Sequence, residues 1–342
     1  MEKTPKDILY SNIPASWYGD LWKEAFPSGN GKTGISVYGA VKKETVLVNH
    51  CNLWHWGKRS DIPYVSSAFR ETKKLLKESR YREADPLIAR ALLDEGYEAE
   101  LYKPCPVGDI CIEMVEEGSF SKYRRSLDMS TGEVSVSWNY GETSYIRKCF
   151  VSREKDIIVL NIVSSVANPG VSVGMRLHET YRDDTVRMKA ETDITSAMAG
   201  ENLVYKAKER NGNSFGIACR ILECDGNIGS EKECISLNDV SYATLIFKVF
   251  GIMDEVRTET EAVRILNSVK GSYKELKDEH ARSHSMLYHS AGFDLHDTQE
   301  CQRSNEELLY LAYNDNVQKE LYEKLWRYGR YLFISGTAPD ML

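Results

Sequence analysis

The sequence predicts a mainly β protein: a large antiparallel sandwich or barrel that carries a small helical insertion and is followed by helices. Three observations support this prediction. Apolar and polar residues alternate over much of 107–250, glycine- and asparagine-rich turns separate the alternating segments, and apolar spacings of three and four take over after 250. Alternation indicates half-buried strands, and the longer spacings indicate amphipathic helices. Many short strands at regular intervals favour a sandwich or barrel over strand–helix units.

A strand hairpin and the helical insertion come before this region. Residues 34–49 place β-branched residues on both sides of a charged break at 42–44, which is typical of a hairpin. Helical spacing follows over 67–79 and 81–93, so we expect an insertion at about 66–95. Pro86 falls inside the second pattern, and we expect it in the first turn or two, where proline costs least.

The C-terminal part is predicted to be helical. Residues 258–269 and 272–288 have helical spacing and many charges, which is typical of a linker packed between domains. A last helix is expected over about 315–335. Its apolar side chains are Leu321, Leu325, Trp326, Tyr328, Leu332 and Phe333. Because both sides of this helix are apolar, we expect it to need a partner, and to cause self-association where none is present.

Composition limits the classes of partner. The chain has 342 residues, enough for about two domains, and a formal net charge of -7 with both signs mixed. This balance argues against nucleic acid, and no apolar run approaches the ~20 residues of a membrane helix. Residues 1–12 lack the apolar core of a secretory signal, so we expect a cytoplasmic protein, or a secreted one if a signal has been removed. The eight cysteines are scattered and are predicted to be reduced.

The segment Gly29-Asn30-Gly31-Lys32-Thr33 superficially resembles a phosphate-binding loop. Such a loop needs a glycine at position 26, where this chain has Phe26, and a helix afterwards, where a strand is expected. We therefore predict a glycine-rich turn entering a strand, and no nucleotide cofactor.

Two histidine clusters suggest metal ligands but lack the required pattern. His280 and His284 follow Glu279, whereas zinc peptidases need the glutamate directly after the first histidine. On a charged helix these histidines are expected to be solvated. His50, Cys51 and His55 lie near a strand end with no evident fourth ligand. We predict no metal site.

Candidate sugar-binding residues gather after the hairpin. Aromatic rings on a loop can stack on sugar faces, and asparagine and histidine can bond hydroxyl groups. The candidates are Asn49, His50, Trp54, His55 and Trp56. An equally favoured interpretation is that the tryptophans anchor the loop to the sandwich. The acidic pairs Asp183-Asp184 and Glu306-Glu307 are predicted to be solvated loop charges, because adjacency in sequence does not make two carboxyl groups face each other across a cleft.

Segments that follow one another along nearly the whole chain resemble glycoside hydrolase family 95, the inverting α-L-fucosidases. These segments are 22–34 (W-x-x-A-x-P-x-G-N-G-x-x-G), 46–57 (L-x-N with L-W and G), 102–109 (Y-x-P with G-D), 123–128 (Y-R-R-x-L-D), 147–152 (R-x-x-F-x-S) and 328–335 (Y-G-R-Y-L with I-S). The resemblance implies a β-super-sandwich domain at 1–255, a helical linker at 256–300, and the first helix of a truncated (α/α)6 barrel at 301–342.

The resemblance also implies where the chemistry takes place. In the family, the general acid glutamate, the base aspartate and the asparagines that assist it lie in the barrel, beyond Leu342. It therefore implies no catalytic residue in this chain and no hydrolase activity for residues 1–342 alone. It further implies a parent enzyme that acts on an oligosaccharide or glycoconjugate glycan without a cofactor, with the rest of the barrel as the fragment's partner.

Departures from the family pattern leave alternatives open. His50-Cys51-Asn52 stand where the family has Glu-Asp-Thr, and His55-Trp56 replace a serine. If this loop borders the sugar pocket, specificity for L- or D-galactosides is an alternative to fucosides. Two further alternatives are a non-catalytic carbohydrate-binding or structural module, and a relative of the family 65 phosphorylases, which share the sandwich-plus-barrel layout.

Overall fold

A computed structural model describes residues 5–16, 21–55, 61–97, 103–115, 118–168, 170–178, 193–199, 201–208, 214–231, 233–251, 256–296 and 303–338. The chain forms two compact units. One comprises Met1–Leu53 with Pro106–Leu342, and the other is the insertion Trp54–Cys105.

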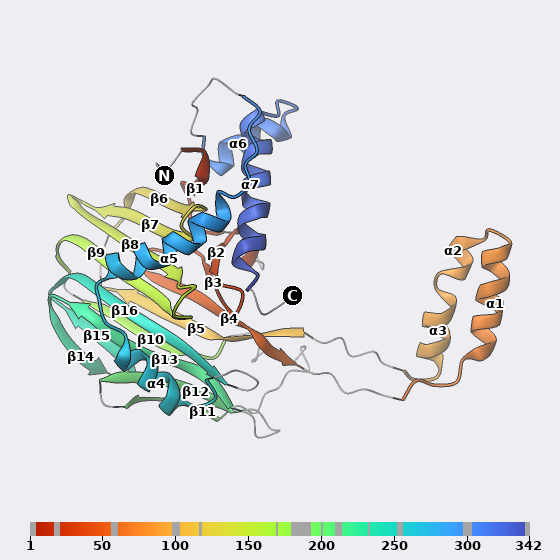
Figure 1. Ribbon diagram of the computed structural model, residues 1–342, viewed down its shortest axis with the longest axis horizontal. Helices are drawn as coiled ribbons and strands as arrows, with labels where there is room; N and C mark the ends of the chain where they lie inside the picture. The colour runs from red at the N-terminus through yellow and green to blue at the C-terminus, as the bar shows by residue number, and fades with distance from the viewer. Residues whose placement is uncertain are drawn as a thin grey trace. The chain divides into compact units, whose positions relative to one another are not determined.

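The first unit is built on two antiparallel sheets, which confirms the predicted mainly β sandwich (Figure 1). The larger sheet has the strand order β1 (Ile8–Ser11), β6 (Ser121–Asp128), β7 (Glu133–Tyr140), β8 (Thr143–Val151), β9 (Ile158–Asn168), β16 (Val240–Gly251), β13 (Ser214–Cys224), β12 (Asn202–Lys208) and β11 (Asp193–Ala199). The smaller sheet has the order β14 (Asn227–Glu231), β15 (Cys234–Asn238), β10 (Val171–Arg176), β5 (Lys103–Met114), β4 (Lys43–His55), β3 (Thr33–Val37) and β2 (Phe26–Gly29).

The predicted hairpin is the β3–β4 pair, in which Val37 lies opposite Val46 and Thr33 opposite His50. Its second strand runs further than expected, because β4 continues to His55. The short edge strand β1 was not predicted. Its Leu9 is buried opposite Leu127 of β6, so a largely polar segment is held by sheet pairing rather than by its own pattern.

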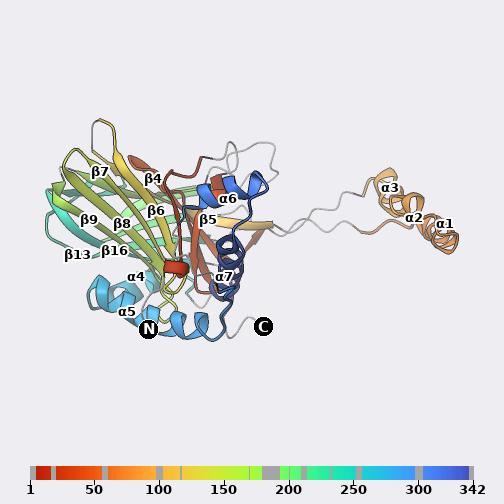
Figure 2. The same ribbon diagram turned by 90° about the horizontal axis from the view of Figure 1, so that it is seen from above.

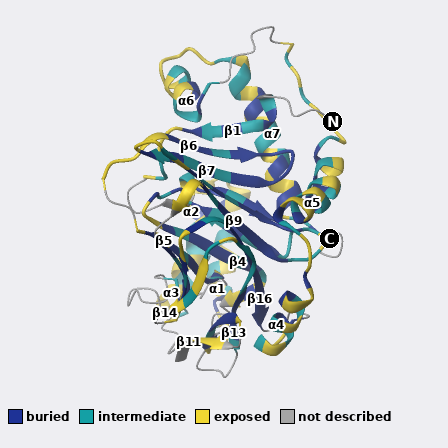
Figure 3. Cartoon of the chain, turned by 90° about the vertical axis from the view of Figure 1, so that its left-hand side faces the viewer, coloured by how far each residue is buried: buried dark blue, intermediate teal, exposed yellow. Residues whose placement is uncertain are grey.

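Strand β16 is buried on both faces, which explains its nearly continuous apolar sequence. Side chains alternate between the two faces of the strand, and Phe247 lies on the face that points away from the linker helices. Ile246 and Phe250 pack with Ala262 and Leu266 in one cluster. These last two residues lie on helix α4 (Glu259–Ser268), which contacts β13 and β16 and leaves its other side exposed (Figures 2 and 3). A strand covered on both sides reads as a continuous apolar run.

The linker helices begin close to the positions predicted from their spacing, and each has a side-chain cap. Thr258 and Ser272 each form a capping box at the start of α4 and α5 (Tyr273–Tyr288). The last helix, α7, is Lys319–Ser335, close to the expected range. Helix α6 (Asn305–Tyr313) was not predicted, and the interpretation of Glu306-Glu307 as loop charge was wrong. Glu307 closes a capping box with Ser304 at the first turn of α6.

The insertion unit contains α1 (Ser66–Lys77), α2 (Tyr81–Ala84) and α3 (Leu87–Asp94). The first helix agrees with prediction. The expected second helix is divided in two, because Pro86 stands between α2 and α3 as the N-cap of α3. Proline has no N–H to donate and its ring clashes with the preceding turn, so it ends α2 and opens α3.

Two further observations concern targeting and redox chemistry. Among the described helices, none combines the length and the apolar character needed to cross a membrane. None of the cysteines that the structure describes forms a disulfide bond, and Cys301 lies outside the described residues. The predicted domain boundaries at 255 and 300 stay predictions.

Candidate functional site

The first two candidate sugar ligands lie within strand β4. Asn49 pairs with Gly34 and is half-buried, whereas His50 pairs with Thr33 and is buried. His50 lines a small void of about 10 Å³ together with Phe250, and its Nδ1 accepts a hydrogen bond from the backbone N–H of Asn52 at 3.3 Å. Successive strand residues point to opposite faces, so Asn49 and His50 are not brought together toward one ligand.

The aromatic candidates occupy the end of the same strand. Trp54 is an exposed residue of β4, with 39% of its surface accessible. His55 is the last residue of the strand, and its side chain is not described. Trp56 lies outside the described residues, as does the pair Asp183-Asp184. Sugar binding by this group stays a prediction.

The glycine-rich turn at 29–33 is structural, as the sequence predicted. Asn30 is buried, and its side-chain oxygen accepts hydrogen bonds from the backbone N–H groups of Lys32 (2.9 Å) and Thr33 (2.8 Å). Its amide nitrogen donates to the backbone oxygen of Ser152 (3.0 Å) and to Asp156 (2.7 Å). The asparagine therefore closes its own turn and joins it to the turn between β8 and β9.

Asp156 is the charged centre of this contact. Its carboxylate also accepts from the hydroxyl of Thr33 (2.9 Å) and pairs with the buried Lys248 (2.5 Å). Burial alone would raise the pKa of Asp156, but Lys248 and the hydrogen bonds from Asn30 and Thr33 outweigh it and hold the pKa below its usual value. The carboxylate thus stays ionised and links two turns to β16.

A second buried ion pair was missed by the sequence analysis. Glu44 of β4 and Arg147 of β8 meet at 3.0 Å, and both side chains are almost fully buried. Burial raises the pKa of Glu44 and lowers that of Arg147, and each charge opposes the shift of the other. Arg147 opens the segment 147–152 that resembles the family pattern, which was the available signal. The pair lies inside the sandwich, so its role is structural.

The prediction that His280 and His284 are solvated was wrong. Both are buried on the inner face of α5, where His280 stacks on Phe150 at 5.1 Å between ring centroids. His284 Nε2 lies 3.0 Å from the backbone oxygen of Met129. Burial lowers the pKa of His280 to about 3 and that of His284 to about 4. No group of three or more histidine, cysteine or acidic residues suited to a metal occurs among the described residues.

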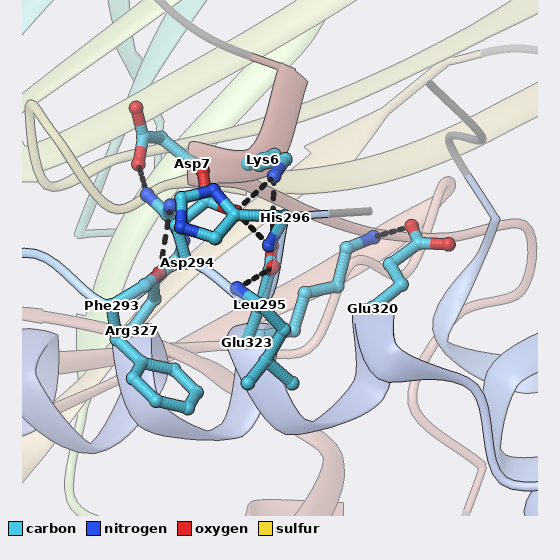
Figure 4. A network of polar contacts seen from close by, with 10 residues as sticks. Lys6, Asp7, Phe293, Asp294, Leu295, His296, Glu320, Glu323 and Arg327 are labelled. Carbon is cyan, nitrogen blue, oxygen red and sulfur yellow. Dashed lines mark hydrogen bonds and ion pairs between the residues drawn. The ribbon is translucent and has the colours of Figure 1, made fainter. Parts of the chain in front are cut away.

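The N-terminal segment is fastened to the helices by a polar network (Figure 4). Asp7 is buried and accepts hydrogen bonds from Arg327 of α7 (2.7 Å) and from the Tyr288 hydroxyl of α5 (3.1 Å). Lys6 forms an ion pair with Glu323 at 3.1 Å. Lys6 and Asp7 both belong to the short helix η1 (Pro5–Asp7). The network therefore joins the first described turn of the chain to two C-terminal helices.

A cavity of about 300 Å³ lies where α6 and α7 meet β1 and β2. Its lining is mostly apolar and includes Phe26, Leu308 and Tyr328. Two carboxylates also border it, but each already holds a backbone N–H: Glu24 that of Ser16 at 2.7 Å, and Glu306 that of Asn12 at 3.2 Å. Glu24 thus holds a neighbouring loop and Glu306 joins α6 to the segment after β1, and the cavity is a feature of the junction between helices and sandwich.

Together these features define a β-sandwich that is followed by helices packed against it. Residues 9–250 match the family described as "Glycosyl hydrolase family 65, N-terminal domain", and the chain belongs to that family. Residues 272–342 match the family described as "Glycosyl hydrolase family 95 catalytic domain". The first match covers the sandwich, and the second begins at Ser272, the N-cap of α5. The resemblance to the N-terminal portion of family 95 enzymes is confirmed.

Curated relatives carry fucosidase names. Alpha-L-fucosidase 2 of Arabidopsis thaliana is 25% identical over 93% of this chain and 41% of the relative. Probable alpha-fucosidase A of Aspergillus niger is 24% identical over 98% of this chain and 43% of the relative. The chain therefore spans less than half the length of these relatives. A solved structure assigned as a kojibiose phosphorylase from the human microbiome has a TM-score of 0.53 at 11% identity, covering 84% of this chain and 38% of that one. That likeness shows the fold alone.

Proposed function

We propose that this chain is the N-terminal part of a glycoside hydrolase that releases terminal α-L-fucosyl groups, or related galacto-configured sugars, from glycans with inversion. One observation carries the proposal: a match to a family 65 N-terminal domain over 9–250 is followed, after the linker at 251–271, by a match to a family 95 catalytic domain over 272–342. The fucosidase names of the relatives support fucose as the sugar.

Within this proposal the sandwich is a support and the helices begin the catalytic domain. Helices α6 and α7 present large exposed apolar side chains, which are Leu309, Tyr310, Tyr313, Tyr322, Leu325, Leu332 and Phe333. Large apolar side chains gathered on two neighbouring helices are typical of an interface. We assign it to packing against the rest of the catalytic domain, which would also supply the acid and base carboxyl groups. Residues 1–342 alone are then inactive.

The test compares residues 1–342 with the protein extended through its catalytic domain. Both are incubated with aryl α-L-fucoside and α-L- and D-galactosides, and the first-formed anomer is followed by proton NMR. We expect the extended protein to release β-L-fucose and residues 1–342 to release nothing. Inversion is the outcome when water attacks the sugar face opposite the leaving group.

Each alternative has its own outcome in the same experiment. Turnover that requires inorganic phosphate would replace hydrolysis with phosphorolysis. If no sugar is released but heat is detected when residues 1–342 are titrated with fucosylated oligosaccharides, a binding module is favoured. Trp54 is then the first side chain to test. Turnover by residues 1–342 alone would disprove their predicted inactivity. The cytoplasmic location likewise stands as a proposal, and cell fractionation tests it.

A further inference from the structure

The C-terminal end of α7 rests on two turns of the sandwich. One is the turn at 29–33 between β2 and β3, and the other is the turn at 152–157 between β8 and β9. Asn30 and Asp156 join these turns, as described above. One turn earlier on the helix, the buried Tyr331 donates a hydrogen bond to the backbone oxygen of Pro27 at 2.7 Å. Figure 1 shows α7 near β2, in agreement with this hydrogen bond.

Two glycines allow the helix end to approach the first turn at backbone distance. A Cβ at Gly29 would lie 2.7 Å from the backbone oxygen of Ser335, and one at Gly31 would lie 2.3 Å from the backbone of Thr337. Gly31 also has a φ of +92°, a conformation that L side chains rarely adopt. Its N–H donates to the Ser335 oxygen at 2.9 Å. This turn therefore takes up one of the carbonyls that a helix end leaves unpaired.

Arg153 binds two further backbone oxygens here, that of Ile334 in the last turn of α7 and that of Thr337 just beyond the helix. Its Nη2 donates to the backbone oxygens of Ile334 (2.8 Å) and Thr337 (2.9 Å), and its Nη1 lies within 3.4 Å of the same two oxygens. A guanidinium at a helix C-terminus satisfies carbonyl acceptors and also opposes the negative end of the helix dipole. The backbone N–H of Arg153 donates to Nδ1 of the buried His280 at 3.2 Å, so the turn that carries the arginine is itself anchored.

We propose that Arg153, together with the turn at 29–33, is a positioning element for the catalytic domain: it fixes the end of α7 and therefore the direction in which the chain leaves the sandwich at 336–338. The proposal rests on the proposed function for its catalytic consequence. The reason is geometric. The contacts join the C-terminal end of α7 to two turns of the sandwich, and the family 95 catalytic match continues through this point.

The chain offers a matched control. Arg220 of β13 donates from Nη1 to the backbone oxygens of Leu266 (2.8 Å) and Val269 (3.2 Å) at the C-terminal end of α4. It therefore makes the same kind of helix cap as Arg153, but on a linker helix that lies before the catalytic match. A variant at Arg220 reports the general cost of losing such a cap.

The experiment uses the protein extended through its catalytic domain, with the variants Arg153→Ala, Arg153→Lys and Arg220→Ala. Hydrogen exchange of 329–338 is measured for each, and kcat and KM are measured separately on the substrate that the wild type hydrolyses. We expect Arg153→Ala to speed exchange at 334–338 and to lower kcat about tenfold, since a small displacement of catalytic groups is costly. Arg153→Lys should recover part of both effects, because its ammonium can still bind a carbonyl. Arg220→Ala should change kcat less than twofold.

Two results would overturn the positioning role. One is exchange at 334–338 that rises no more in Arg153→Ala than in Arg220→Ala. The other is a kcat for Arg153→Ala within twofold of that for Arg220→Ala. If the wild type releases no sugar at all, the proposed function fails, and hydrogen exchange alone decides whether Arg153 holds the helix end.

Discussion

Helices α5 and α7 have nearly the same length, 16 and 17 residues, but they bury their apolar side chains differently. Helix α5 buries one stripe at intervals of four, namely Leu276, His280, His284 and Tyr288, and its large exposed apolar residues are confined to its last turn. Helix α7 buries Tyr331 and Ile334 on the sandwich and still exposes Leu325, Leu332 and Phe333.

The difference shows which helix has already buried its apolar stripe against other described residues. A helix whose apolar stripe is fully used needs no further partner, whereas a helix that is apolar on a second side is suited to the interior of a larger helical domain. Helix α5 is of the first kind and α7 of the second. This agrees with the proposed roles of α5 as a link to the sandwich and of α7 as a part of the catalytic domain.

The largest expected effect tests burial directly. Leu276→Ala on α5 removes a side chain that is 2% exposed in the core cluster, and we expect it to lower the free energy of unfolding by about 2–5 kcal/mol. Leu325→Ala on α7 removes one that is 58% exposed and should cost under about 1 kcal/mol in residues 1–342. Urea unfolding measures both. Equal losses would mean that Leu325 contributes as much to the stability of residues 1–342 as Leu276 does.

The next largest effect is the dependence of folding stability on pH, which arises from the two histidines buried on α5. The pKa values of His280 (about 3) and His284 (about 4) lie below the ordinary 6.5, so the unfolded chain takes up protons at a pH where the folded chain does not. Stability is therefore fully present above pH 6.5 and falls as the pH drops toward 4. The loss is at most about 1.4 kcal/mol per pH unit for each histidine.

A variant pair isolates this contribution from that of the carboxyl groups. His284→Gln keeps a donor for the Met129 oxygen but does not titrate, and we expect it to reduce the loss of stability between pH 7 and pH 5 by about 2 kcal/mol. His296→Gln, at a side chain that is 93% exposed, serves as control and should leave the loss unchanged. Urea midpoints at the two pH values give the answer. The same loss in both variants would contradict burial of His284 as the cause.

The smallest effect on folding concerns the exposed side of α7. We expect residues 1–342 to self-associate through this side, and the double variant Leu325→Lys, Phe333→Lys to reduce association while changing the free energy of unfolding by less than about 1 kcal/mol. Met286→Lys on α5 is the control and should leave association unchanged. Sedimentation velocity over a range of concentrations measures it. A wild-type chain that stays monomeric at all concentrations would show that this side does not drive association.

Local pattern was sufficient where side chains follow one period. The β3–β4 hairpin, α4, α5 and α7 were predicted because their apolar spacing is local, although β4 runs on to His55. Strand β1 was missed because it is held by pairing with β6 and not by a pattern of its own. Helix α6 was missed because the acidic residues of its first turn were interpreted as loop charges. Pro86 was placed inside a helix, whereas backbone geometry made it a boundary.

The candidate site was predictable only in part. The sequence drew attention to Gly29, Asn30 and Gly31 by their density, but their contact with the end of α7 spans about three hundred residues of chain and leaves no local pattern. Arg153 carried no signal at all, because an arginine in a polar turn is ordinary. His50 and Trp54 looked like neighbours on a loop, yet they lie on one strand, with His50 buried and Trp54 exposed.

The sequence by itself determined the periods, the turns and the caps, and through its ordered motifs the family and the sandwich with its following helices. These features depend on residues close together in the chain, or on a pattern shared with relatives. Only the tertiary structure decided that His280 and His284 are buried and neutral, that Glu44 and Arg147 pair inside the sandwich, and that the glycine turn and Arg153 hold the end of α7. Each of these depends on which surfaces meet. Burial raises the free-energy cost of an ionised group, and these two backbones can come into contact only where a glycine leaves room.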